Sequence, residues 1–308
     1  MTDSTTVREV LNATRELIEP AHRSAIDRLS PELRHVAGYH IGWWDEQGNE
    51  LIGGQGRFVR PALTLACARA VGGQAADAVP MAVATELVND FSLLHDDVIG
   101  GGDTRRERPA AWTVFGLSEA LLTGDALLAV AMSLVGPAGV RTVADALLDL
   151  CHGQATDMAF VNRPAVTLDE AMTVAGKKTG ALLGAACELG ALAGGACDMK
   201  VFREFGTRLG LAFRLTDDLR SLVSDLACRR KSLPVVAAME SGTPAATRLA
   251  ESPDADPETQ ADLVEQTGAR QWALREADRQ VELAFAALGH GATPELRLLA
   301  DLSVGRGR

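Results

Sequence analysis

Two pairs of adjacent aspartates each end an apolar stretch of this 308-residue chain. Asp96 and Asp97 follow apolar residues spaced by three and four, as on one face of a helix, and Asp217 and Asp218 follow the run LGLAF. Hard divalent cations prefer carboxylate oxygens, so paired acids suit Mg²⁺. A single pair is more often a solvated helix end, but its repetition favours a metal site. We therefore expect these four aspartates to hold Mg²⁺.

A basic cluster follows the first acid pair along the chain. The glycines at 100–102 come between them, and we expect the helix to break there because glycine is costly inside a helix. Arg105, Arg106 and Arg108 come next. Guanidinium forks bind phosphate oxygens, and a metal ion held by carboxylates bridges the others. The stretch from Glu86 to Pro109 therefore predicts a magnesium–phosphate site.

A series of motifs makes the chain resemble the trans-isoprenyl diphosphate synthases, or polyprenyl synthetases, of the actinobacterial type. The resemblance extends from about Gly54 to Ala238 and rests on the order and spacing of these motifs. They are GRFVRPALTLACARAVGG (Gly56–Gly73), FSLLHDDV (Phe91–Val98), DTRRERPA (Asp103–Ala110), GDALLA (Gly124–Ala129), GQATDMAF (Gly153–Phe160), KTGALLGAACELGAL (Lys178–Leu192), LAFRLTDDL (Leu211–Leu219) and KSLPVVAA (Lys231–Ala238).

The resemblance implies an all-α isoprenoid-synthase bundle around a central active-site cavity and a Mg²⁺-dependent prenyltransferase activity. In that family an allylic diphosphate is ionised, its carbocation alkylates isopentenyl diphosphate, and a proton leaves. In the family, a phenylalanine five residues before the first acid, here Phe91, forms the floor of the product pocket. It stops the growing chain at C15 to C20. Core packing is the ordinary alternative for Phe91.

The resemblance also assigns roles to individual residues. The catalytic set is Asp96, Asp97, Asp217, Lys178 and Arg105. The substrate-binding set is Arg57, Arg60, Asn89, Arg105, Arg106, Gln154, Lys178, Thr179, Arg214, Lys231 and Phe91, and Asp157 matches a further position of the allylic site.

Four positions depart from the family pattern. Gly100 and Ser221 stand where the two motifs keep a third acid, and Asn89 stands where the family has histidine. Arg214 replaces a glutamine one turn before Asp217. Its guanidinium could form an ordinary ion pair with Asp217, or it could replace part of a metal ion's charge. Both alternatives stay open at the level of sequence.

These departures leave two other functions open. A terpene cyclase or lyase would need only the ionising site, and a non-catalytic partner subunit would need only the fold. Retention of Arg57, Arg60 and Arg106 favours elongation, since a cyclase has no use for a second diphosphate site. Retention of acids in both motifs favours an enzyme.

Helical patterns fill most of the chain, and no linker divides it. We expect helices at Thr5–Leu29 and Pro31–Ile41, and alanine- and leucine-rich helices from Pro61 onward, without strand-like alternation. Residues Glu251–Glu258 are the most loop-like, and we expect a single domain over residues 1–308. Glycines mark the expected joints at Gly72–Gly73, Gly116, Gly124, Gly136, Gly194–Gly195 and Gly242.

Composition narrows the class of protein. Hydrophobic residues make up 47% of the chain, and its net charge of −11 argues against nucleic acid as a partner. None of the five cysteines forms a CxxC pair, which predicts a reducing, cytoplasmic location without disulfides or zinc. We expect no signal peptide and no apolar run able to span a bilayer. The expected assembly is a homodimer, or a heterodimer with a homologous synthase.

Overall fold

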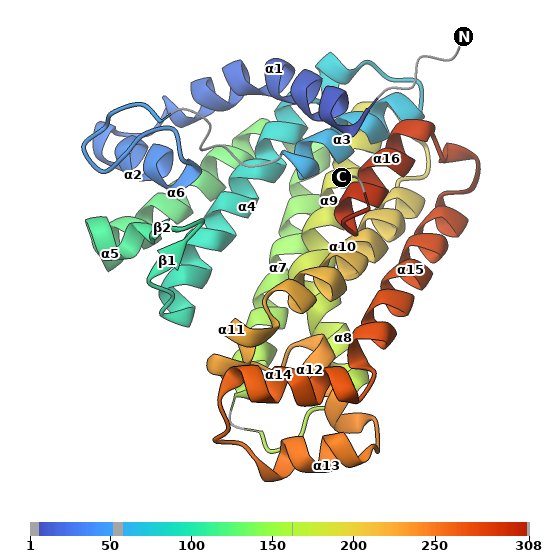
Figure 1. The fold of residues 1–308 in the computed structure, drawn as a ribbon. Coiled ribbons are helices and arrows are strands. Elements are labelled where there is room, and N and C mark those ends of the chain that lie inside the picture. Colours follow the sequence, from blue (N-terminus) through green and yellow to red (C-terminus); the bar gives the residue numbers. More distant parts are fainter. Residues whose placement is uncertain (1–5, 52–57, 162, 307–308) are drawn as a thin grey trace. The chain divides into compact units, whose positions relative to one another are not determined.

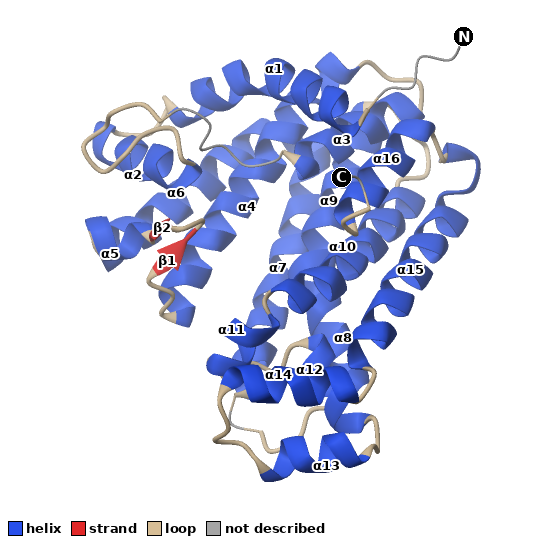
Figure 2. Ribbon diagram, viewed as in Figure 1, coloured by secondary structure: helices blue, strands red, loops and turns tan. Residues whose placement is uncertain are grey.

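The structure is a computed structural model that describes residues 6–51, 58–161 and 163–306. Figure 1 shows the path of the chain and Figure 2 its secondary structure. The described residues form sixteen α-helices: α1 (Val7–Ile26), α2 (Pro31–Ile41), α3 (Val59–Ala70), α4 (Val79–Gly100), α5 (Ala111–Phe115), α6 (Leu117–Leu134), α7 (Gly136–Phe160), α8 (Leu168–Ala175), α9 (Ala181–Ala193), α10 (Lys200–Arg220), α11 (Leu222–Ala227), α12 (Leu233–Glu240), α13 (Pro244–Glu251), α14 (Pro257–Gln266), α15 (Ala269–Leu288) and α16 (Pro294–Ser303). Three short helical turns, η1 (Ala75–Ala78), η2 (Gly176–Gly180) and η3 (Gly289–Gly291), complete them. The all-α prediction is confirmed.

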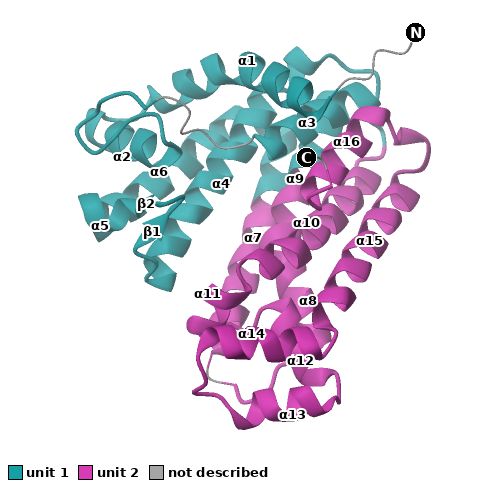
Figure 3. Cartoon of the chain, viewed as in Figure 1, with its two compact units in different colours: residues 1–143, 186–197 teal, residues 144–185, 198–308 magenta. Residues whose placement is uncertain are grey.

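The chain divides into two compact units, coloured separately in Figure 3. Unit 1 comprises residues 1–143 and 186–197, and unit 2 comprises residues 144–185 and 198–308. The first acid pair belongs to unit 1 and the second to unit 2, so each is described within its own unit. The prediction of a single domain stays a prediction.

Unit 1 is organised around α4. The helix packs against α3 and α6, and Leu87 and Leu94 on its inner face are fully buried. Gly124 lets α6 approach closely, because a Cβ at this position would lie 2.6 Å from the ring of His95. Gly124 therefore lies within α6 and does not mark the joint between helices that the sequence predicts.

Unit 2 is organised around α10. Its flank against α15 is closed by the rings of Phe205 and Phe285, whose centroids are 5.3 Å apart. Its other flank meets η2, where a Cβ on Gly210 would lie 2.6 Å from the Cα of Gly180. The close approach places the residues of η2 beside the helix that carries the second acid pair.

Local sequence signals set most helix ends. The prediction of Pro31–Ile41 is confirmed, since Ser30 caps the helix, Pro31 opens it and Gly42 ends it in the left-handed region. The first helix is shorter than predicted and runs from Val7 to Ile26. The predicted loop at Glu251–Glu258 is confirmed between α13 and α14, although both of its ends are helical.

The expected break at the glycines 100–102 is confirmed, since Gly100 is the last helical residue and Gly101, with a φ of 63°, ends α4. Two other features correct the sequence-based picture. Two short antiparallel strands, β1 (Thr104–Arg105) and β2 (Arg108–Pro109), follow α4. The expectation that no segment could span a bilayer was wrong for α6, which is long and apolar enough by length and composition alone. That is a weak indication, because core helices of soluble proteins have the same composition.

Candidate active site

The end of α4 and the hairpin behind it hold an acid–base pair. Asp97 is 4% exposed, and the Nε of Arg105 on β1 lies 3.0 Å from both of its carboxylate oxygens. Arg105 Nη2 also donates to Asp97 Oδ1 at 2.5 Å. The Asp97 carboxylate is thus held by a guanidinium, while the neighbouring Asp96 is only half-buried. The two predicted metal ligands therefore differ in their surroundings.

The turn of the hairpin holds Arg106 in an uncommon conformation. Arg106 and Glu107 have φ angles of 52° and 64°, the left-handed pair that a tight two-residue hairpin requires. Arg106 Nη1 donates to the carbonyl of Ile41 at 3.3 Å. Arg108 donates to two further carbonyls near the end of α2. The arginines and α2 enclose a cavity of about 90 Å³, lined by Tyr39, His40, Gly42, Arg105, Arg106, Arg108, Pro109 and Ala111.

Two acids on α4 are buried and interact electrostatically with basic groups of this unit. Glu86 and Asp90 are 7% and 2% exposed, and burial raises the pKa of both, that of Asp90 well above its usual range. Arg60 and Arg106 oppose these shifts electrostatically. Arg106 is exposed, whereas Arg60 is half-buried and its Nε is buried without a hydrogen-bond partner among the described residues. Asn89, on the same helix, is 3% exposed.

His40 joins this group from α2. Its Nε2 lies 3.9 Å from Asp90 Oδ1, and both side chains are almost fully buried. Burial, with a smaller contribution from the three hairpin arginines, lowers the pKa of His40 to about 3, so the imidazole is neutral. Sequence analysis missed Glu86, Asp90 and His40. The i,i+4 spacing of the two acids on an otherwise apolar helix was the signal that could have found the first two.

Phe91 packs at the contact between α4 and α6. Its ring is half-buried and lies 4.6 Å from the ring of His95, centroid to centroid. His95 Nε2 lies 3.1 Å from the carbonyl of Leu121. Both rings face Gly124, where any larger residue would collide with His95. The position of Phe91 thus depends on the small residue opposite it.

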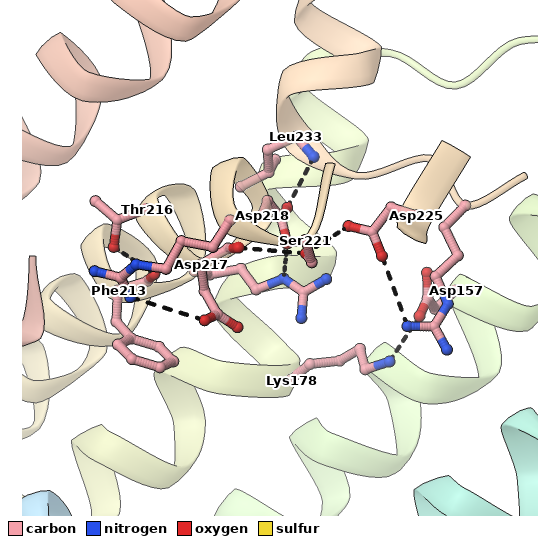
Figure 4. A network of polar contacts seen from close by, with 12 residues as sticks. Asp157, Lys178, Phe213, Thr216, Asp217, Asp218, Ser221, Asp225 and Leu233 are labelled. Atoms are coloured by element: carbon pink, nitrogen blue, oxygen red, sulfur yellow. Dashed lines mark hydrogen bonds and ion pairs between the residues drawn. The ribbon is translucent and has the colours of Figure 1, made fainter. Parts of the chain in front are cut away.

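The second acid pair takes part in a polar network of unit 2, drawn in Figure 4. Arg214 Nε lies 2.7 Å from Asp218 Oδ1, and the backbone N–H of Leu233 donates to Asp218 Oδ2 at 2.9 Å. Of the two alternatives left open for Arg214, the ion pair forms with Asp218 and not with Asp217, because the i,i+4 spacing brings Asp218 to the guanidinium. Asp217 has a side chain that is 45% exposed, and Arg220 Nη1 lies 4.0 Å from it.

Ser221 and Asp225 extend this network beyond α10. Ser221 Oγ donates to Asp225 Oδ2 at 2.9 Å (Figure 4). Arg230 Nη1 lies 3.8 Å from Asp225 Oδ1. Burial raises the pKa of Asp225, and the Ser221 hydrogen bond opposes this shift. Asp225 was missed in the sequence, although it lies one helical turn after the position where the third acid is lost.

Burial and charge act against each other in the Arg214–Asp218 pair. Burial raises the pKa of Asp218 to about 6, although Arg214 works to lower it. Burial lowers the pKa of Arg214, but the surrounding carboxylates, Asp218 first, raise it above its usual value. The guanidinium therefore stays charged.

The remaining predicted residues of unit 2 lie on α7, on η2 and before α12. Lys178 Nζ pairs with Asp157 Oδ2 at 2.6 Å, and Thr179 follows Lys178 in η2. The Oε1 of Gln154 is buried and accepts no hydrogen bond from the described residues. Lys231 Nζ donates to the backbone carbonyls of Phe160 and Arg163, so this ammonium is engaged by the chain itself. Arg57 lies outside the described residues.

Comparisons with known proteins agree on one family. The model of the polyprenyl synthetase family matches residues 42–268. The geranylgeranyl diphosphate synthase of Mycobacterium tuberculosis is 39% identical over 96% of this chain and 93% of its own length. The (2E,6E)-farnesyl diphosphate synthase of Mycobacterium bovis is 39% identical over 88% of this chain and 84% of its own length. The crystal structure of a polyprenyl synthetase from Streptomyces coelicolor superposes with a TM-score of 0.91 at 38% identity, covering 97% of this chain and 99% of that one.

Proposed function

The chain belongs to the polyprenyl synthetase family, and on this premise we propose that it condenses an allylic diphosphate with isopentenyl diphosphate to a C15–C20 product. Its relatives are prenyltransferases named for C15 and C20 products. The fold is that of the family's all-α isoprenoid synthases. Elongation thus has support from the relatives that the cyclase and partner-subunit alternatives do not have.

The single observation that carries the proposal is that Arg60 and Arg106, from different elements, both act on the buried acids Glu86 and Asp90 of α4. Arg106 is exposed, whereas Arg60 is half-buried and its buried Nε has no hydrogen-bond partner among the described residues. Buried acids hold such cations in place, and arginine forks suit diphosphate oxygens. We assign this place, with Asn89, to isopentenyl diphosphate, and the family pattern adds Arg57, which lies outside the described residues. An enzyme that only ionised one allylic diphosphate would have no need of it.

The ionising role is assigned to the residues around the acid pair of each unit. Family members are generally magnesium-dependent. Asp96 of unit 1 and Asp217 of unit 2 are partly exposed carboxylates, the ligand type that Mg²⁺ prefers, and each would hold an ion within its own unit. Asp97 and Asp218, the other two predicted ligands, are each engaged by an arginine. Bound Mg²⁺ would supply charge that stabilises the departing diphosphate.

The chain's own cations complete the leaving-group site. In unit 1 Arg105 would bind diphosphate oxygens, and in unit 2 Lys178 would do so, with Gln154, Thr179 and Arg214 assigned to the same role in that unit. Each cation is oriented by a carboxylate, Lys178 by Asp157 and Arg105 by Asp97. Such prior orientation stabilises charge that develops during the reaction. Lys231 would act through the backbone that it holds. Phe91 would limit the growth of the chain.

Assembly and location complete the proposal. We propose a homodimer in the cytoplasm. Light scattering on the purified chain, alone and mixed with a homologous synthase, distinguishes a homodimer from a heterodimer.

A substrate panel tests the proposed function. The protein is incubated with Mg²⁺ and dimethylallyl, geranyl, farnesyl or geranylgeranyl diphosphate, each with and without isopentenyl diphosphate. We expect products of C15 to C20 only when isopentenyl diphosphate is present, and none in excess chelator. Products without isopentenyl diphosphate would contradict elongation and indicate a cyclase or lyase.

A further inference from the structure

Arg214 lies at the electrostatic centre of the acids of unit 2. Four carboxylates act on its guanidinium: Asp218, Asp225, Asp217 and Asp157. Asp218 is the acid that Arg214 contacts, in an ion pair of 2.7 Å. The other three acids come from α10, α11 and α7 and act on it electrostatically. The guanidinium thus supplies the positive charge that a cation at the second acid pair would supply.

The other acids of the group already have cations of their own. Lys178 pairs with Asp157, and Arg230 lies near Asp225. Asp218 is 2% exposed, and its second oxygen accepts the N–H of Leu233. Asp217 is the member whose carboxylate is nearly half exposed and whose nearest cation, Arg220, is 4.0 Å away. Asp217 is therefore the acid of α10 best placed to bind a metal.

We propose that the Arg214 guanidinium is the resident cation of the second acid pair and takes the place of one divalent cation there. Arg214 Nε holds Asp218, while a third of its side chain remains exposed, so its Nη groups can reach diphosphate oxygens. Asp218 is then a ligand of Arg214, and Asp217 alone of the pair binds metal. The inference rests on the proposed function for the identity of the anion.

Counting bound Mn²⁺ tests the inference without turnover. Electron paramagnetic resonance measures the Mn²⁺ bound per protomer of the full chain in saturating pyrophosphate. We expect Arg214→Gln to bind one more ion than the wild type, because Asp218 loses its cation. Arg214→Lys keeps the charge and should bind the wild-type number.

Arg208→Gln is the matched control. Arg208 is also on α10 and pairs with an acid at i,i+4 spacing, Glu204 at 2.6 Å, but it lies outside the acid group. Arg208→Gln should bind the same number of Mn²⁺ ions per protomer as the wild type. Equal counts for wild type and Arg214→Gln, zero included, would overturn the inference.

A double variant keeps the inference testable if Arg214→Gln does not fold. If Arg214→Gln is unfolded by its unpaired buried acid, the double variant Arg214→Gln, Asp218→Asn removes both charges. It should bind the wild-type number of ions, and an extra ion in this protein would overturn the inference. If the wild type elongates but binds as many Mn²⁺ ions as Arg214→Gln, the proposed function holds and this inference fails. If Arg214→Gln binds more ions but the wild type does not elongate, this inference holds and the proposed function fails.

Discussion

Asp96 and Asp97 are adjacent in sequence but differ in their burial. Asp97 is buried against the Arg105 fork, whereas Asp96 is half-buried. Asp97→Ala leaves the Arg105 charge without its partner, although a side chain that is 30% exposed is partly compensated by water. We therefore expect Asp97→Ala to lose more thermal stability than Asp96→Ala.

Activity should respond differently from stability. Removal of either acid should lower kcat about a hundredfold, or ~3 kcal/mol, because both bear on the leaving group. Melting curves and single-turnover rates of the two variants measure the two effects separately. Equal loss of stability would show that the Arg105–Asp97 pair does not support the fold.

Phe91 is expected to set product length. Its half-buried ring lies four residues before His95 at the contact with α6, and truncation would open space along α4. Phe91→Ala should lengthen the main product by at least one C5 unit, measured by mass spectrometry. Val83→Ala is the control, because Val83 is fully buried on α4 two turns further back. A stable, active Phe91→Ala with unchanged product would place the floor elsewhere.

At the scale of elements, the β1–β2 hairpin combines a binding residue with backbone strain. Arg106 and Glu107 both occupy the left-handed region that disfavours residues with a Cβ by roughly 1–2 kcal/mol each. Glu107 is exposed. Glu107→Gly should therefore stabilise the protein by about 1 kcal/mol, measured by urea denaturation. Glu107→Ala keeps the strain and should show no such gain, so an equal gain in both would point to the lost charge instead.

The end of α4 offers a test of the altered first motif. Gly100 is the last helical residue and is exposed, so an aspartate fits there without a positive φ. A carboxylate is unfavourable at a helix C-terminus by about 0.3–1 kcal/mol, which roughly offsets the gain from replacing glycine. Gly100→Asp should lower the Mg²⁺ midpoint of product formation about tenfold, or ~1.4 kcal/mol.

Gly101→Asp is the control for this variant. Gly101 has a φ of 63°, so the substitution adds strain and directs the carboxylate differently. Its Mg²⁺ midpoint should not fall. An unchanged midpoint in Gly100→Asp would show that this position does not face the metal.

Local signals explain how far the sequence could predict the elements. The bounds of α2 followed from Pro31 and Gly42, because proline and left-handed glycine act through the backbone alone. The end of α4 lies within the predicted glycine run 100–102, but the sequence does not show that Gly101 is the glycine that adopts the left-handed conformation. The partner of Arg214 was missed because i,i+3 and i,i+4 neighbours are equally near on a helix. Tertiary packing decided between them.

The residues of the candidate site could be predicted where they belong to continuous motifs. The buried charged residues could not be predicted in this way. Asp96, Asp97, Asp217 and Lys178 are found by pattern. Glu86 and Asp90 were hidden because a sequence gives no direct sign that an acid on a helix points inward. Their burial is a property of how α3, α4 and the hairpin pack.

At the scale of the whole molecule, buried histidines make stability depend on pH. His22 lies among Trp43 and Phe58, and burial lowers its pKa from 6.5 to about 4. The unfolded chain then binds a proton more readily than the folded one as pH falls below 6.5. The free energy of unfolding should decrease between pH 6.5 and 4, by roughly 3 kcal/mol for this residue.

The variant His22→Leu isolates this effect. Glu86 and Asp90 have raised pKa values and oppose the trend, but they act equally in both proteins. The Tm of the wild type should therefore fall more steeply than that of His22→Leu as pH is lowered. Parallel curves would show that His22 is protonated equally in the folded and unfolded states.

The central claim is that this chain joins two diphosphates into a longer one. The most direct measurement is the mass of the product formed from an unlabelled allylic diphosphate and carbon-13-labelled isopentenyl diphosphate. The account predicts a prenyl diphosphate of C15 to C20 whose mass rises by one labelled isoprene unit for every condensation. The contradicting result is an unlabelled hydrocarbon or alcohol released from the allylic substrate alone.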